Sequence, residues 1–81
     1  MKFTWPESAR AELRAVDRDS ALRILQALTR YVDSGEGDVK ALVGQWQGFF
    51  RLRVGDYRVV FVISNDEATV MRVRHRSDVY H

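Results

Sequence analysis

The stretch FFRLRVGDYRVVF, residues 49 to 61, predicts two β-strands joined by a tight turn. The pair Gly55-Asp56 separates two runs of alternating residues, and glycine at the first position of a two-residue loop is typical of a type II′ hairpin. Such a loop fixes the register, so Arg53 lies directly opposite Arg58 and one face of the hairpin is basic. The other face is expected to pack under helices with seven apolar residues: Phe50, Leu52, Val54, Tyr57, Val59, Phe61 and Ile63.

The basic side of this hairpin holds Arg51, Arg53 and Arg58. Like charges that face each other across strands repel, and such a local loss of stability is expected where residues serve function. All six basic residues after position 48 are arginines, whose planar guanidinium stays charged and fits phosphate oxygens. The bias predicts a phosphate-bearing partner. The alternative is a solvated surface on which each arginine pairs with a nearby acid.

The segment ATVMRVRHR, residues 68 to 76, predicts a third strand with the same two faces. If Met71 and Val73 face the core, the alternate residues join the basic side: Arg72, Arg74 and Arg76. That parity requires an odd loop length, so we expect a three-residue turn at residues 65 to 67. The turn would set Met71 opposite Phe61.

The amino-terminal half predicts two helices after a short strand. Residues 2 to 5, KFTW, alternate as an edge or first strand, and Pro6 can open a helix because its missing N–H would have no partner there. The polar run from Asp17 to Ser20 supplies an N-cap for a second, longer helix, and the glycines of DSGEGD end it. The apolar positions form one stripe on each helix, and the stripe of the second helix is expected to belong to the core: Ala9, Leu13 and Val16, then Ala21, Ile24, Leu25, Leu28 and Val32.

The chain is therefore expected to be a single α+β domain over residues 1 to 81. Two N-terminal helices form an αα-hairpin that packs on a small antiparallel β-meander. The segment VKALVGQWQG, residues 39 to 48, is interpreted as a connector that tucks Trp46 against the core, because Gly44 and Gly48 interrupt any regular pattern. Alternatively, Trp46 stacks on a nucleobase.

Composition excludes several classes of protein. The chain has no cysteine, and its two histidines have no carboxylate at ligand spacing, so no disulfide, metal site or cofactor is expected. The amino terminus lacks an apolar stretch of signal-peptide length, and no run approaches the roughly 20 residues that span a bilayer. The sequence therefore predicts a cytoplasmic protein with no membrane partner.

Two segments resemble the toxin halves of type II toxin–antitoxin pairs. GQWQGFFRLRVGDYRVVF and, after it, MRVRHRSDVYH are similar to the sheet signature of the RelE/ParE toxin superfamily, and the predicted elements agree with it in order along the whole chain. The resemblance implies a RelE-like fold. It implies a ribosome-dependent mRNA endoribonuclease for RelE-like members and a DNA gyrase inhibitor without nuclease activity for ParE-like members. Fold alone does not separate these activities.

The resemblance also implies roles for single residues. The RelE-like active site uses basic residues on the second strand, an arginine after the hairpin, an arginine near the end of the last strand and a carboxyl-terminal tyrosine. The matching positions form the expected catalytic set: Arg51, Arg53, Arg58, Arg76 and Tyr80. Arginines replace the lysines of the founding pattern on the second strand. Because arginine does not lose its proton, the identity of the general base stays open.

Cleavage without a metal would proceed by attack of the ribose 2′-OH on the adjacent phosphate, with arginines stabilising the developing charge. His75 and His81 are candidates for proton transfer. Alternatively, His75 is a rim histidine over the core and Tyr80 is a strand-end tyrosine with a hydrated hydroxyl. Three further residues are expected to bind RNA: Arg72, Arg74 and Trp46.

The resemblance implies a cognate antitoxin as partner, in assemblies up to a heterotetramer, together with the ribosome and mRNA. We expect an acidic antitoxin with a segment that is disordered alone and covers the arginines. Three functions stay open: an mRNA interferase, a gyrase inhibitor, and a catalytically inactive homologue kept as an interaction partner. The sequence favours the first because every position of the catalytic set is filled.

Overall fold

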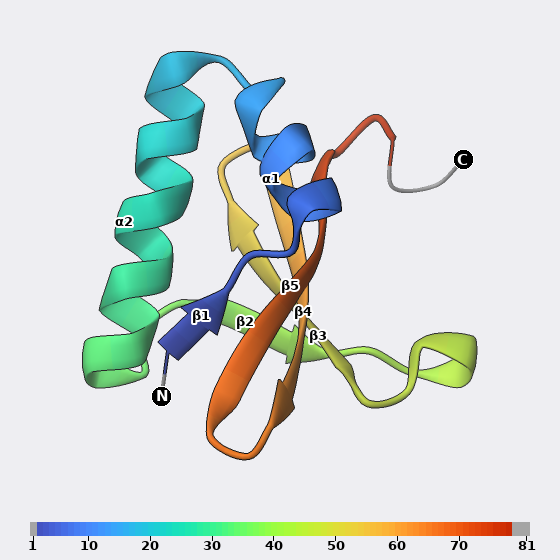
Figure 1. Cartoon of the computed structure of the whole chain (residues 1–81). Helices are drawn as coiled ribbons and strands as arrows, with labels where there is room; N and C mark the ends of the chain where they lie inside the picture. The colour runs from blue at the N-terminus through green and yellow to red at the C-terminus, as the bar shows by residue number, and fades with distance from the viewer. Residues whose placement is uncertain (1, 79–81) are drawn as a thin grey trace.

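The computed structural model describes residues 2 to 78, in which two helices cover one face of a five-stranded sheet (Figure 1). The elements are β1 Lys2–Thr4, α1 Glu7–Arg14, α2 Arg18–Ser34, β2 Asp38–Ala41, the short 3-10 helix η1 Gly44–Trp46, β3 Phe49–Val54, β4 Tyr57–Ser64 and β5 Glu67–His75. The sheet order is β1-β5-β4-β3-β2, with β1 parallel to β5 and the other neighbours antiparallel. Within this part of the chain no helix is long and apolar enough to cross a membrane. The predicted α+β fold is confirmed.

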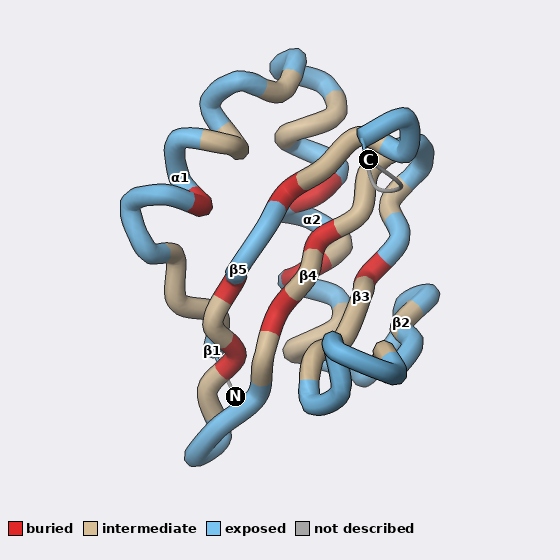
Figure 2. Tube along the Cα trace, turned by 90° about the vertical axis from the view of Figure 1, so that its right-hand side faces the viewer, coloured by how far each residue is buried: buried red, intermediate tan, exposed pale blue. Residues whose placement is uncertain are grey.

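The core lies between the two helices and the sheet. Its buried side chains are Ala9, Ile24, Leu28, Leu52, Val59, Phe61, Ala68, Val70 and Val73. Buried positions recur along β3, β4 and β5 between less buried ones (Figure 2), as expected for a sheet with one covered face. Phe61 is central, because its ring contacts those of Phe3, Tyr31 and Phe50 at centroid distances of 5.3, 5.9 and 5.7 Å.

Helix α2 has the predicted ends. The Asp17 carboxylate accepts a hydrogen bond from the Ser20 N–H at 3.0 Å, which satisfies a donor at the helix start. Gly35 ends the helix in the left-handed conformation, with φ of 76°. The prediction that Leu25 belongs to the core is wrong, because the sheet covers the side of α2 that carries Ile24 and leaves Leu25 44% exposed.

The β3–β4 hairpin has the predicted register, with Arg53 opposite Arg58. Gly55 has φ of 59°, and Asp56 is not among the residues with positive φ, which is the pattern of a type II′ turn. The apolar side is confirmed with one exception. Ile63 is 37% exposed, because it is the second-last residue of β4 and lies near the end of the sheet.

The connection between β4 and β5 differs from the prediction. Its loop has two residues, 65 and 66, with φ of 52° and 60°, so the three-residue turn is wrong. A β-bulge changes the parity instead: Val70 pairs with Phe61, and Met71 is the extra residue before Arg72. The prediction that Met71 lies opposite Phe61 in the core is therefore wrong, and Met71 is 41% exposed. The bulge keeps Arg72 on its predicted face.

Strand β2 was not predicted from the sequence, and it adds residues to the site. The interpretation of residues 39 to 48 as a connector is wrong for this strand, which pairs with β3 at the edge of the sheet. The pairing sets Asp38 opposite Arg53 and Lys40 opposite Arg51. Two further charged residues thus align with the hairpin arginines.

Candidate functional site

Cross-strand pairing collects positive charge on the sheet face opposite the helices. Directly paired residues point to the same face. One row across β2, β3, β4 and β5 consists of Asp38, Arg53, Arg58 and Arg74. The neighbouring row consists of Lys40, Arg51, Val60 and Arg72. We call the six cations of these rows the basic face: Lys40, Arg51, Arg53, Arg58, Arg72 and Arg74.

The arginines on the β3 part of the basic face form no ion pair within residues 2 to 78, although Asp38 lies opposite Arg53 in the sheet register. Arg53 is exposed and Arg51 is half-buried. The Nε atom of Arg51 is buried and has no hydrogen-bond partner in the described part of the chain. Over the same residues, no hydrogen bond or ion pair holds the Arg53 side chain. A buried charged donor without a partner destabilises a protein, so Arg51 is placed here at a cost to stability.

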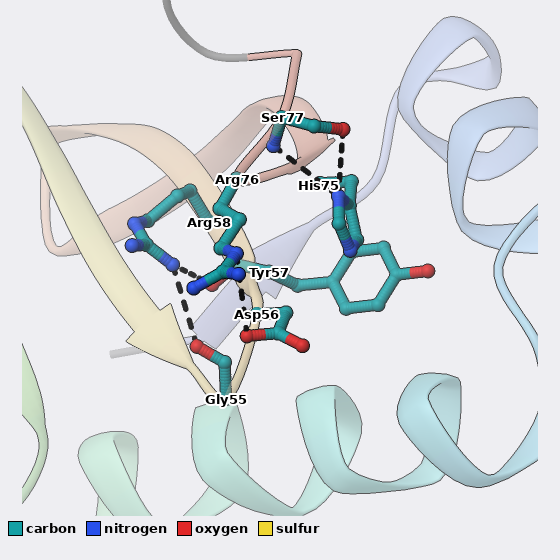
Figure 3. Close-up of polar contacts among 7 residues, drawn as sticks. All are labelled: Gly55, Asp56, Tyr57, Arg58, His75, Arg76 and Ser77. Carbon is teal, nitrogen blue, oxygen red and sulfur yellow. Dashed lines mark hydrogen bonds and ion pairs between the residues drawn. The ribbon is translucent and has the colours of Figure 1, made fainter.

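Arg58 and Arg76 lie at the hairpin turn (Figure 3). Arg58 Nη1 is 3.4 Å from the Gly55 carbonyl oxygen and 3.2 Å from the Tyr57 carbonyl oxygen. These neutral acceptors orient the guanidinium but do not neutralise its charge. Arg76 Nε is 3.8 Å from Asp56 Oδ1, and the Arg76 N–H donates to the Asp56 carbonyl oxygen at 2.7 Å. Arg76 therefore has a nearby acid, but an ion pair this exposed contributes only about 0–1 kcal/mol.

His75 belongs to the covered side of the sheet, because it pairs with Tyr57 in a row next to the core. The two rings meet edge to face at 5.2 Å. The Ser77 N–H donates to His75 Nδ1 at 3.2 Å, and Ser77 Oγ lies 2.8 Å from the same atom (Figure 3). The neutral ring then carries its proton on Nε2. Burial, followed by the negative charge of Asp17, raises the pKa of the Tyr57 hydroxyl. The sheet separates this group from the basic face.

The β5 part of the basic face is paired with an acid from α1. Arg74 Nη1 is 2.5 Å from Glu12 Oε2, and Arg72 Nη1 is 3.8 Å from the same oxygen. The Glu12 side chain is only 22% exposed. Two of the cations expected to contact RNA therefore share one carboxylate.

Trp46 lies in η1 at the start of β3. Its ring packs edge to face on Phe49 at a centroid distance of 5.6 Å, yet Trp46 is 44% exposed. The prediction that Trp46 is tucked against the core is therefore wrong, because its ring contact is with Phe49, which lies outside the core cluster, and free indole surface remains. Tyr80 and His81, the remaining members of the expected site, lie outside the described residues.

Sequence reasoning missed three charged residues at this site: Asp38, Lys40 and Glu12. The signal for the first two was the alternation in DVKA, in which Val39 packs against the core while its neighbours are exposed. No local signal identifies Glu12, because its contacts depend on how α1 packs on β5.

The sequence pattern of the ParE toxin of type II toxin–antitoxin systems, parDE, matches residues 3–80. The match covers nearly the whole chain, so the protein belongs to this family of toxins. The predicted resemblance to the RelE/ParE superfamily is confirmed. No curated protein sequence matches the chain.

Solved toxin structures have the same fold. The RelB-RelE antitoxin–toxin complex from Methanococcus jannaschii has a chain that is 22% identical, with a TM-score of 0.75 and coverage of 94% of this chain and 93% of that one. The RelBE2 toxin–antitoxin complex from Mycobacterium tuberculosis has a 22% identical chain, a TM-score of 0.76 and coverage of 93% and 96%. The YoeB/ParE toxin from Agrobacterium tumefaciens is 19% identical, with a TM-score of 0.75 and coverage of 93% and 98%.

Proposed function

We propose that this toxin is a ribosome-dependent mRNA endoribonuclease. The observation that carries the proposal is the part of the basic face on β3 and β4. Arg51 and Arg53 form no ion pair within residues 2 to 78, and Arg58 is oriented by neutral carbonyl oxygens. Guanidinium groups that are fixed but not neutralised are suited to bind a phosphate whose negative charge grows during reaction.

The reaction needs no metal ion. The ribose 2′-oxygen attacks the adjacent phosphorus, the bond from phosphorus to the 5′-oxygen breaks, and the products are a 2′,3′-cyclic phosphate and a free 5′-OH. Arg51, Arg53 and Arg58 would stabilise the charge on the non-bridging oxygens. Removal of one such contact commonly raises a barrier by about 2.7–4 kcal/mol.

Two proton transfers complete the reaction. One group takes the proton from the 2′-OH, and a second group protonates the leaving 5′-oxygen. Arginine does not serve as the base, so Lys40 joins the candidates from the sequence. The sequence candidates that remain are Tyr80 and His81, because His75 lies on the covered side of the sheet and not on the basic face. Lys40 lies directly opposite Arg51, which places it beside the proposed phosphate position.

A cognate antitoxin is the proposed partner. The family is that of toxins from type II toxin–antitoxin systems, and related folds occur in the RelB-RelE complex and in a heterotetrameric YoeB-YefM complex from Staphylococcus aureus. An acidic segment would neutralise the exposed arginines, so its binding should weaken as salt rises. The proposed action on translated mRNA places the toxin in the cytoplasm.

Inhibition of DNA gyrase is the second candidate function, because the matching family is named for the ParE toxin. The two functions are separated by expressing the toxin without its antitoxin. An endoribonuclease should produce new 5′ ends in translated regions of an abundant message, detected by primer extension. Intact message together with inhibited supercoiling by the purified toxin would replace the proposal with the gyrase function. Normal growth would identify an inactive homologue.

A further inference from the structure

The basic face has two parts that differ in ion pairing: the arginines of β5 pair with Glu12, and those of β3 and β4 form no ion pair within residues 2 to 78. Glu12 lies in α1, which packs on the edge of β5 beyond the point where β1 ends. Its Oε1 accepts a hydrogen bond from the Val73 N–H at 2.8 Å, and its Oε2 accepts one from Arg74 Nη1 at 2.5 Å. One oxygen is thus anchored to the backbone of β5, and the other is held against a guanidinium.

This anchoring makes the pair with Arg74 stronger than an ordinary surface ion pair. The Glu12 side chain is 22% exposed and that of Arg74 is 36% exposed, so water screens the two charges only in part. Because the Val73 N–H already fixes the carboxylate, little further side-chain freedom is lost when the pair forms. The Arg72 guanidinium lies 3.8 Å from the same oxygen and adds a second positive charge to it.

The β3 and β4 part of the basic face contrasts with this arrangement. Over residues 2 to 78, Arg53 has no ion pair, Arg58 contacts only carbonyl oxygens, and Arg51 leaves Nε without a partner. A phosphate that approaches these groups displaces no carboxylate. A phosphate that approaches Arg74 competes with one.

We propose that Glu12 is a positioning residue that withholds Arg72 and Arg74 from RNA, so that RNA phosphates bind the β3 and β4 part of the basic face. This inference rests on the proposed function in taking RNA as the ligand. Glu12 sets where the RNA backbone lies and limits the charge available to bind it.

The test compares Glu12→Gln with Glu7→Gln. Glutamine at position 12 keeps a carbonyl oxygen for the Val73 N–H but removes the charge that holds Arg74. Glu7→Gln is the matched control, because it lies on the same helix, changes net charge equally and releases Arg14, whose Nη2 is 2.6 Å from Glu7 Oε1. The probe is a short oligouridine RNA, and the measurement is the slope of log affinity against log salt.

Each phosphate contact on a single strand contributes about 0.7 to that slope. Glu12→Gln should steepen the slope by about 0.7 to 1.4, for one or two released arginines, and Glu7→Gln should leave it unchanged. Arg53→Gln should make the slope shallower by about 0.7, while Arg74→Gln should not change it. Equal slopes for the two glutamate variants, an Arg74→Gln effect as large as that of Arg53→Gln, or no measurable RNA binding by the unaltered toxin would overturn the inference.

Cleavage of translated message, measured separately, distinguishes failure of the inference from failure of the proposed function. If the slopes are as expected but no message is cleaved, the endoribonuclease function is refuted and the role of Glu12 in RNA binding stands. If message is cleaved but Glu12→Gln and Glu7→Gln give equal slopes, the role of Glu12 is refuted and the endoribonuclease function stands.

Discussion

The two faces of the β3–β4 hairpin differ in what their side chains do for stability, although both faces belong to the same two strands. On the covered side, Leu52 pairs with Val59 and both are buried, at 1% and 0% exposure. On the other side, Arg53 pairs with Arg58, and the two like charges repel. One side therefore stabilises the fold, and the other loses stability to gather positive charge.

Under the proposed function, a chain of 81 residues keeps folding on one side of the hairpin and activity on the other. Substitutions on the covered side should unfold the protein, whereas substitutions on the basic face should impair activity and leave the fold intact.

Phe61→Ala should lower the free energy of unfolding by about 3–5 kcal/mol, because it leaves a cavity where three aromatic rings meet. Denaturant unfolding checks the value. Ile63→Ala is the control on the same strand, since Ile63 is 37% exposed and its truncation should matter much less. Equal losses for the two variants would mean that the core is misplaced.

Arg51→Met should reduce message cleavage by about 100-fold to 1000-fold, the usual effect of losing one donor to a developing charge. The same variant should be more stable than the unaltered toxin, because methionine removes the buried donor without a partner. Primer extension and thermal unfolding measure the two effects. An active but destabilised variant would show that Arg51 serves the fold.

Trp46→Ala should weaken RNA binding by about 1–3 kcal/mol if the exposed part of the indole stacks on a base. Within residues 2 to 78, the Trp46 ring pairs with one aromatic ring, that of Phe49. The melting temperature of Trp46→Ala should therefore change little. Trp46→Phe keeps a stacking surface and should retain most of the affinity. A melting temperature that falls while RNA affinity is unchanged would leave Trp46 as a packing residue.

The Asp17 carboxyl should make the stability of the protein modestly dependent on pH. The Ser20 N–H, which donates to Asp17, holds the pKa of that carboxyl below its usual value. A lowered folded-state pKa adds stability that is complete above the unfolded value of about 3.9 and is lost as pH falls through the folded value. Asp17→Asn retains the cap but does not titrate, so its melting temperature should fall less between neutral pH and acid. Parallel curves for both proteins would contradict this role.

Local patterns predicted the hairpin correctly, because a two-residue loop leaves only one register for Arg53 and Arg58. The same reasoning failed at β5, where the parity that sets Val73 toward the core comes from a bulge at Met71 and not from the turn. A bulge depends on partner strands and has no local signal there. Glu12 was unpredictable for a similar reason, since only the packing of α1 on β5 brings it to the arginines.

The most direct test of the account measures thermal stability and message cleavage together for Arg53→Gln and Arg58→Gln. Arg58→Gln removes one of two repelling charges, so the free energy of unfolding should stay the same or rise by about 0.2–1 kcal/mol. Arg53→Gln also removes the positive charge opposite Asp38, so its free energy of unfolding should change little. Cleavage of translated message by either variant should fall sharply. Variants that lose stability and still cleave message would contradict the claim that the basic face serves function.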